Sequence, residues 1–248
     1  MTTTNTQKNA LVAGGAGFIG SHLCRLLLSK GYHVVIVDNF VTGRKENIQD
    51  LLDAPHLKNQ ISLVNVDICQ PEFVPQMLKQ FTGPNKLHEI YNLASPASPV
   101  DFKIMPVFIL ETGSKGTQNL LELAKQQQAR VLLASTSEVY GDPLVHPQVE
   151  TYFGNVNSIG ARSCYDEAKR YAEAITMAYH RAYGVDTRIA RIFNTYGPEM
   201  RPEDGRIIPN FFIQAMQGED LTIYGDGSQT RSFCFVSDMA AGLFALMQ

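Results

Sequence analysis

Short apolar runs rich in β-branched residues recur along the chain, and longer segments with helical spacing or loop composition separate them. These runs lie at residues 10–13, 33–38, 61–66, 89–94, 131–135 and 187–192. Each has the length of a strand that is buried on both faces. Strands that alternate with helices assemble into a parallel sheet through right-handed crossovers. The pattern therefore predicts an α/β protein with a doubly wound parallel sheet.

Helical periodicity is clearest in three of the intervening segments. Apolar residues from Ile19 to Leu27 share one helical face, and Gly31 follows as a C-terminal stop. The same periodicity predicts helices over residues 117–127 and 166–183. We expect helices between consecutive strands to cover the two faces of the sheet.

The chain divides near Asn194, where Gly, Pro and charged residues become concentrated. Such a composition predicts a loop that leaves the sheet, and we expect a substrate-facing segment to begin there. We therefore expect a disordered N-terminus at residues 1–8, a nucleotide-binding domain at 9–193 and the start of a substrate-binding region at 194–248. Within that region, we expect residues 237–248 to form a helix that returns to the main domain, and the C-terminal remainder to be absent.

Composition and charge narrow the classes of function. With 21 Lys and Arg against 24 Asp and Glu, the net charge of −3 has the wrong sign for general attraction to nucleic-acid phosphates. No apolar run approaches the ~18 residues of a membrane span. The four cysteines, at positions 24, 69, 164 and 234, form no C-x-x-C pair, so we expect neither a metal site nor a disulfide framework. We expect a cytoplasmic protein with no nucleic-acid and no membrane partner.

A glycine-rich turn follows the first predicted strand. Gly14, Gly17 and Gly20 give the spacing G-x-x-G-x-x-G where the first predicted helix begins. In a Rossmann-like fold, the first glycine allows a tight turn, the second lets the backbone approach a pyrophosphate, and the third packs the helix on the strand. Such a motif alone can be a mere turn, but Asp38 ends the second predicted strand about 20 residues on, as a dinucleotide site requires.

The carboxylate of Asp38 decides which dinucleotide we expect. It can accept hydrogen bonds from the adenosine ribose hydroxyls and would repel a 2′-phosphate, so NAD is favoured over NADP. Arg44 and Lys45 are near enough in sequence to leave NADP open. Asp67 ends the third predicted strand, where it contacts either the adenine or only solvent.

Tyr165 and Lys169 form the motif Y-x-x-x-K, which places both side chains on one helical face. A nearby cation favours the phenolate of a tyrosine and so makes it a usable base near neutral pH. Alone, the motif is also compatible with a solvated surface pair. The run from Ala134 to Gly141 favours the catalytic interpretation, because it would bring hydroxyls and a carboxylate to the carboxyl edge of the sheet.

Together these segments resemble the extended short-chain dehydrogenase/reductases that act on nucleotide sugars. The resemblance is carried by the glycine turn, by 92–95 (NLAS), 135–141 (STSEVYG) and 191–198 (RIFNTYGP), and by Tyr165 with Lys169. Segments 146–170, 204–211 and 221–233 are more specifically similar to the family of UDP-glucuronic acid decarboxylases, also called UDP-xylose synthases. One segment departs from the pattern of the extended family, since Thr112-Gly113-Ser114 stands where relatives usually carry Thr-Asn.

The resemblance implies a role for each residue that matches a family motif. Thr136 would hydrogen-bond the sugar 4-hydroxyl, Tyr165 would be the general base, and Lys169 would hold the nicotinamide ribose and tune Tyr165. Ser137 and Glu138 follow Thr136 where related 4,6-dehydratases carry Asp-Glu and where 4-epimerases usually carry no carboxylate. Thr-Ser-Glu is the version of the decarboxylases, although the part played by Glu138 does not follow from the sequence.

The resemblance also implies a substrate-binding set. Arg231 would face the substrate near its carboxylate and pyrophosphate, and would also be catalytic. Asn194, Arg206 and Tyr224 would hold the UDP portion, unless they only cap a turn, are solvated or pack, respectively. The implied cofactor-binding residues are Gly14, Gly17, Phe18, Ile19, Gly20, Asp38, Asn39, Asp67, Leu93, Tyr165 and Lys169.

The activity implied is NAD-dependent decarboxylation of UDP-glucuronate to UDP-xylose through a 4-keto intermediate. We also expect a homodimer, because the dimers of the family pair the helices that correspond to about 100–127 and 166–183. Two alternatives remain at this point. The chain could be a nucleotide-sugar 4-epimerase or 4,6-dehydratase, or a truncated NAD-binding module without turnover.

Overall fold

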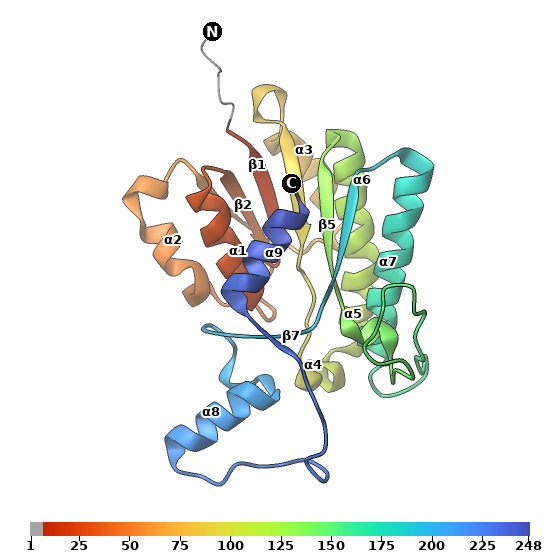
Figure 1. Ribbon diagram of the computed structural model, residues 1–248. Helices are drawn as coiled ribbons and strands as arrows, with labels where there is room; N and C mark the ends of the chain where they lie inside the picture. Colours follow the sequence, from red (N-terminus) through yellow and green to blue (C-terminus); the bar gives the residue numbers. More distant parts are fainter. Residues whose placement is uncertain (1–6) are drawn as a thin grey trace.

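A six-stranded parallel sheet forms the centre of the molecule (Figure 1), seen in a computed structural model that describes residues 7–248. The strands are β1 (Asn9–Ala13), β2 (His33–Asp38), β3 (Ile61–Asn65), β4 (Leu87–Asn92), β5 (Arg130–Thr136) and β6 (Thr187–Ile192). They lie in the order β3-β2-β1-β4-β5-β6, and every neighbouring pair is parallel. Each strand overlaps one of the six apolar runs, with ends that differ by at most two residues, which confirms the predicted α/β fold with a doubly wound sheet.

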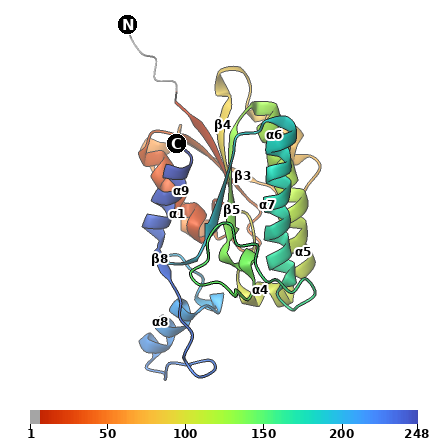
Figure 2. The same ribbon diagram turned by 45° about the vertical axis from the view of Figure 1, so that its right-hand side comes forward.

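Helices cover both faces of the sheet (Figure 2). The longer ones are α1 (Phe18–Ser29), α3 (Phe73–Gln80), α6 (Thr117–Gln127), α7 (Ser163–Tyr183), α8 (Ile207–Gln217) and α9 (Val236–Leu246), and the shorter ones are α2 (Gln49–Asp53), α4 (Pro99–Ile104) and α5 (Pro106–Glu111). Leu11 and Ala13 of β1 pack with α3, α6 and α7, whereas Ala10 and Val12 pack with α1 and α9. This alternation explains why β1 is apolar throughout. The helix predicted over 117–127 is confirmed.

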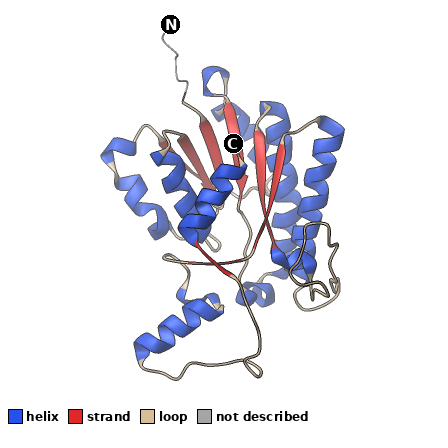
Figure 3. Cartoon of the chain, in the orientation of Figure 1, coloured by secondary structure: helices blue, strands red, loops and turns tan. Residues whose placement is uncertain are grey.

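Beyond β6 the chain leaves the sheet and forms a small second layer at its carboxyl edge (Figure 3). The sequence predicts a loop at Asn194, but Asn194–Tyr196 form strand β7, which pairs in parallel with β8 (Phe233–Phe235). The difference arises because the partner strand lies far along the chain, where the local composition carries no sign of it. After β8 the chain returns as α9, whose Leu243 packs in the same cluster as Leu23 of α1.

Gly113 brings α7 close to the chain that precedes α6. It lies in the π-helical turn Thr112–Gly116, between α5 and α6. A Cβ atom at Gly113 would lie 2.7 Å from Cβ and 3.0 Å from the carbonyl oxygen of Ala168 in α7. A larger residue would therefore push α7 outward, and α7 carries Tyr165 and Lys169. This packing gives a physical reason for the glycine at the position that departs from the extended family.

The N-terminal stretch that is expected to be disordered falls mostly on residues 1–6, which lie outside the described part of the chain. Within the part of it that the structure describes, Lys8 pairs with buried Glu89 at an N–O distance of 3.1 Å. Among residues 7–248, no helix combines the length and the apolar character needed to cross a bilayer.

Candidate active site

A cavity of about 330 Å³ opens at the carboxyl edge of the sheet, next to β1 and β4, where the strand order reverses. Ligands of doubly wound folds bind at this switch point. The glycine turn, the end of β5 with α7, and the segment after β6 supply its walls. The sequence-predicted site residues that line it are Gly14, Gly17, Phe18, Ile19, Gly20, Leu93, Thr136, Ser137, Glu138, Tyr165, Lys169, Asn194, Arg206 and Arg231.

Three more of the predicted cofactor residues, Asp38, Asn39 and Asp67, line a smaller hollow of about 70 Å³. This hollow shares Gly14 and Gly17 with the main cavity, so the two spaces form one crevice across the glycine turn.

Tyr224 is the predicted residue that the structure does not bring to this crevice. Its side chain is 75% exposed, and it lies in the segment between α8 and β8. That segment turns back on itself, since the Gln229 amide donates to the Tyr224 carbonyl oxygen at 3.2 Å.

The glycine turn is shaped to receive an extended anionic ligand. Gly14 has a φ of +77°, and a Cβ there would lie 2.8 Å from the backbone nitrogen of Ala94. A Cβ at Gly20 would lie 2.1 Å from the carbonyl oxygen of Gly14. Gly17 caps the start of α1 with extended backbone, no side chain caps this helix, and its first turn holds no acidic residue. Its free N–H groups and helix dipole therefore favour a pyrophosphate, so the turn fits a dinucleotide.

Backbone hydrogen bonds hold Asp38 in the smaller hollow, at the end of β2. Its Oδ2 accepts from the Ala16 N–H and its Oδ1 from the Phe40 N–H, both at 2.9 Å. Burial raises the pKa of this carboxyl, and the backbone donors oppose that shift. Asp67 is also held, because it accepts from the Asn39 amide at 3.2 Å and from the Cys69 N–H at 2.8 Å. Each of the two carboxylates keeps further lone pairs for ligand hydroxyls.

Tyr165 and Lys169 are both buried, and burial changes the acidity of both. The pKa of Tyr165 is raised to about 12, chiefly by desolvation, although the adjacent Thr136 hydroxyl lowers it. The Lys169 Nζ donates to the Ala134 carbonyl oxygen at 2.8 Å and lies 5.8 Å from the centre of the Tyr165 ring. Burial lowers the pKa of Lys169 to about 8. Desolvation therefore dominates the pKa of Tyr165 in the ligand-free protein, and the role of Lys169 in tuning Tyr165 stays a prediction.

Several charged groups of this cavity were not singled out from the sequence. Arg162 donates to Glu138 at 2.5 Å, and its guanidinium lies 5.8 Å from the centre of the Phe102 ring. Arg201 pairs with buried Asp101 at 2.6 Å. Arg162 belongs to the segment that carried the family resemblance, so a signal for it existed. Arg201 carried no such local signal.

Two predicted substrate-binding arginines differ in their surroundings. Arg206 is paired with buried Asp204, whose Oδ2 accepts from its Nη2 at 2.7 Å. Arg231 is exposed and donates to the carbonyl oxygen of neighbouring Thr230 at 2.7 Å. Pairing of β7 with β8 brings Asn194 close to Arg231, since the Asn194 amide donates to the carbonyl oxygen of Ser232 at 3.3 Å. The segment after β6 thus supplies an amide and two guanidinium groups to the cavity.

Comparison with known sequences identifies close relatives. UDP-glucuronic acid decarboxylase 4 of Arabidopsis thaliana is 54% identical over 238 residues, which cover 96% of this chain and 50% of that protein. UDP-glucuronic acid decarboxylase 1 of Xenopus tropicalis is 50% identical over 241 residues, 97% of this chain and 54% of that protein. The chain thus spans about half the length of these curated relatives.

Solved structures and a family model agree with this relationship. UDP-glucose 4-epimerase of Thermotoga maritima, solved with UDP-glucose, superposes with a TM-score of 0.84 at 28% identity, covering 97% of this chain and 73% of that one. A dTDP-glucose 4,6-dehydratase of Streptomyces venezuelae, solved with NAD bound, gives a TM-score of 0.82 at 30% identity, covering 97% and 72%. The model of the GDP-mannose 4,6-dehydratase family matches residues 11–248. The chain therefore belongs to this family of extended short-chain dehydrogenase/reductases.

Proposed function

We propose that the protein is a carboxy-lyase that converts UDP-glucuronate into UDP-xylose through a 4-keto intermediate, with NAD in the crevice across the glycine turn. The observation that carries the proposal is that Thr136, Ser137 and Glu138 meet Tyr165 and Lys169 in one cavity. The identity of 50–54% to UDP-glucuronic acid decarboxylases supports the same activity. Glu138 argues against a 4-epimerase, and Ser137 argues against a 4,6-dehydratase.

The cofactor would lie along the crevice, with its pyrophosphate on the glycine turn. Gly14, Gly17 and Asp38 would hold its adenosine half, Asn39 and Asp67 would line the adenine, and the first turn of α1 would face its phosphates. When bound, NAD⁺ would supply hydride-transfer chemistry at C4 of the sugar, as acceptor and then as donor. Asp38 favours NAD over NADP, because its buried carboxylate would repel a 2′-phosphate.

The proton chemistry at C4 falls to Tyr165 and its neighbours. Thr136 would hydrogen-bond the 4-hydroxyl, and Tyr165 would take its proton as a general base. Lys169, held by the Ala134 carbonyl, would fix the orientation of the nicotinamide ribose. Burial raises the pKa of Tyr165 to about 12 in the ligand-free protein, whereas the adjacent Thr136 hydroxyl and the Arg206 charge favour the phenolate.

Decarboxylation follows from the position of the carboxylate once C4 is a ketone. The C6 carboxylate is then β to a carbonyl, so the C5–C6 bond can break and release CO₂ while its electron pair forms an enolate. Donors near Thr136 and Tyr165 would stabilise the enolate oxygen. A proton then adds at C5, and reduction of the C4 ketone gives the pentose. The Arg162–Glu138 pair lies beside these groups and would order the water or the carboxylate in this step.

Product analysis tests the proposal directly. The purified 248-residue chain is incubated with NAD⁺ and either UDP-glucuronate or UDP-glucose, and the products are identified by mass spectrometry and by NMR of the sugar ring. We expect CO₂ and UDP-xylose. A product of unchanged mass with inverted C4 would identify an epimerase, and loss of water from a UDP-hexose would identify a dehydratase. Binding of NAD⁺ without any product would identify a binding module.

The protein also has a surface that suits a homodimer. The side chains of Ile104, Val107, Leu110 and Tyr171, on α4, α5 and α7, are between 41% and 67% exposed, and α5 and α7 lie side by side on one flank of the molecule (Figure 2). We expect sedimentation to give twice the monomer mass, and Val107→Glu to shift it to the monomer. A monomeric wild type would overturn the dimer. All four cysteines are free, which suits a cytoplasmic location.

A further inference from the structure

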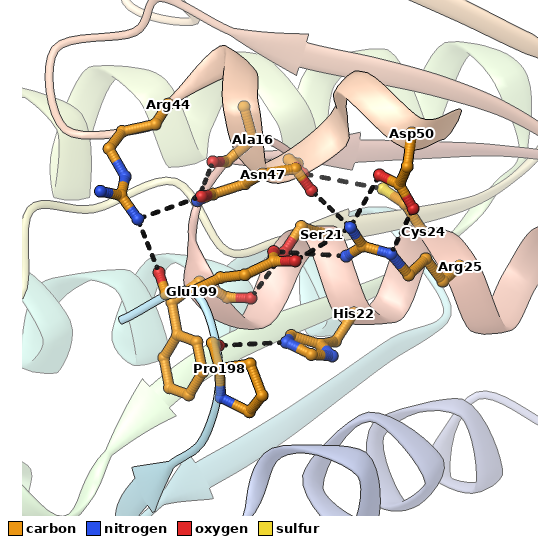
Figure 4. A network of polar contacts seen from close by, with 12 residues as sticks. Ala16, Ser21, His22, Cys24, Arg25, Arg44, Asn47, Asp50, Pro198 and Glu199 are labelled. Carbon is orange, nitrogen blue, oxygen red and sulfur yellow. Dashed lines mark hydrogen bonds and ion pairs between the residues drawn. The ribbon is translucent and has the colours of Figure 1, made fainter. Parts of the chain in front are cut away.

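Glu199 ties the segment after β7 to the dinucleotide-binding helix (Figure 4). Its carboxylate accepts from two nitrogens of Arg25 in α1, at 3.0 and 3.3 Å, across a separation of 174 residues. It also accepts from the Ser21 hydroxyl at 2.8 Å. Glu199 has a φ of +71°, a conformation that residues other than glycine rarely adopt. The backbone strain at Glu199 is offset by the two charge-assisted hydrogen bonds that its carboxylate accepts from Arg25. The strain therefore indicates that this contact is a selected feature of the fold.

The contact continues into the glycine turn through Asn47 and Arg44. The Asn47 amide donates to the Ala16 carbonyl at 2.9 Å, and the Asn47 carbonyl accepts from Arg25 at 2.8 Å. The Arg44 backbone N–H also donates to the Ala16 carbonyl, at 3.0 Å, and its side chain reaches the Asn47 amide oxygen at 3.3 Å and the Glu199 carbonyl at 3.5 Å. Residue 199 is thus linked to Ala16, whose N–H holds Asp38.

Glu199 also lines the main cavity, together with Gly17, Phe18 and Asn47. The crevice for the dinucleotide therefore has the glycine turn on one side and the 198–201 segment on the other, and the carboxylate of Glu199 joins the two sides. The neighbouring Pro198 carbonyl contacts His22 of α1 at 3.2 Å, which places the segment along the same helix.

We propose that Glu199 is a positioning residue that keeps this segment closed over the phosphate end of the crevice and thereby slows dissociation of the cofactor. The inference rests on the proposed function, in which the hydride taken from C4 must return to the same sugar. A cofactor that leaves in the reduced form before the second transfer would strand the 4-keto intermediate. Slow dissociation of the reduced cofactor would therefore allow each 4-keto intermediate to be converted into product.

The chain offers a matched control for this contact. Arg25 also binds Asp50, at 2.8 Å, but the side chain of Asp50 is 58% exposed and forms no hydrogen bond or ion pair with the 198–201 segment, whereas the side chain of Glu199 is 25% exposed. Loss of Asp50 removes a solvated partner of the same guanidinium. Loss of Glu199 removes the link between the two sides of the crevice.

The test is the rate of NADH dissociation, measured by stopped-flow fluorescence with excess NAD⁺ as the trap. We expect Glu199→Gln to raise the rate constant about tenfold, the change that corresponds to loss of one charge-assisted hydrogen bond. Glu199→Gly should raise it equally, although glycine suits the positive φ, because the carboxylate rather than the backbone makes the contact. Asp50→Asn should stay within about twofold of the wild type.

The possible failures are distinguishable. Equal rates for the wild type and Glu199→Gln, in variants with unchanged circular dichroism, overturn the role of Glu199. A slower rate in Glu199→Gln overturns it as well, since it would mean that the carboxylate repels the pyrophosphate. A wild-type chain that binds no NADH overturns the proposed function instead. A burst of 4-keto product and free NADH from Glu199→Gln alone supports the inference independently of the rate constant.

Discussion

Gly113 offers a sharp test of how α7 is held against its neighbours. In Gly113→Ala the new methyl group would lie 2.7 Å from Cβ of Ala168, whereas carbon atoms pack at roughly 3.5–4.0 Å. The helices must therefore separate by about 1 Å. Such overpacking costs about 1–3 kcal/mol, and alanine recovers about 0.5–1 kcal/mol of backbone entropy in a helix. We expect a net loss of roughly 1–2 kcal/mol in the free energy of unfolding.

The matched control is Gly242→Ala in α9. Nothing lies within 4 Å of the Cβ position at Gly242, so only the entropic gain applies and the variant should be more stable by about 0.5–1 kcal/mol. Because the chain contains no tryptophan, urea unfolding is followed by far-ultraviolet circular dichroism. The same substitution is thus expected to have opposite signs at two helical glycines. A Gly113→Ala variant at least as stable as the wild type would refute the argument.

The displacement of α7 in Gly113→Ala should also lower the catalytic rate. Ala168 lies directly before Lys169 and three residues after Tyr165, so movement of α7 shifts both groups relative to Thr136. A misplacement of about 1 Å can reduce a rate by 10²-fold. We expect Gly113→Ala to lower kcat, and Ala168→Gly in the double variant to restore part of the loss. Normal kcat in Gly113→Ala would show that α7 is not displaced.

Three further outcomes are expected. Tyr165→Phe should lower the rate of CO₂ release by ~10²–10⁴-fold with the fold intact, and near-normal turnover would exclude Tyr165 as the base. NAD⁺ should bind more tightly than NADP⁺ in calorimetry, and the reverse order would show that Arg44 rather than Asp38 sets the preference. Lys169→Met should be more stable than the wild type at pH 7, because burial lowers the pKa of Lys169 to about 8 and the folded state holds the ammonium at a cost. The Lys169 amine binds its proton more tightly in the unfolded chain than in the folded protein, so the free energy of unfolding of the wild type should rise between pH 8 and 10.5. The stability advantage of Lys169→Met should shrink over the same range. A difference in stability that stays constant with pH would contradict this prediction.

The strands of the main sheet could be predicted because they are buried on both faces. A continuous apolar run of strand length, such as His33–Asp38, is typical of a parallel sheet that helices cover on each side. The sequence predicts that the helix with Tyr183 begins at about 166, whereas α7 begins at Ser163. The reason is local, since the residue before this helix, Arg162, makes no side-chain capping bond and gives no N-cap signal.

Contacts between distant segments could not be predicted. β7 and β8 have three residues each, too few for a period, and they become strands only because Asn194 pairs with Phe233. The contact between Glu199 and Arg25 spans 174 residues and depends on a positive φ that no local motif indicates. The residues of the glycine turn and of the Tyr165 motif are close together in sequence, and each motif follows or begins a predicted element. Their positions in the crevice could therefore be predicted.

The pKa values of the buried groups on α7 are the property that is hardest to predict from the sequence. The motif that contains Tyr165 and Lys169 suggests mutual stabilisation, yet burial disfavours the charged form of both groups and sets their pKa values at about 12 and about 8. Burial also raises the pKa of Asp166, one residue on, to about 6, and its Oδ1 has no hydrogen-bond partner. In three titratable groups on the first turns of α7, burial thus disfavours the charged form. Titratable groups whose pKa values are shifted by burial are typical of functional sites. In the ligand-free protein, the phenol of Tyr165 therefore keeps its proton at neutral pH.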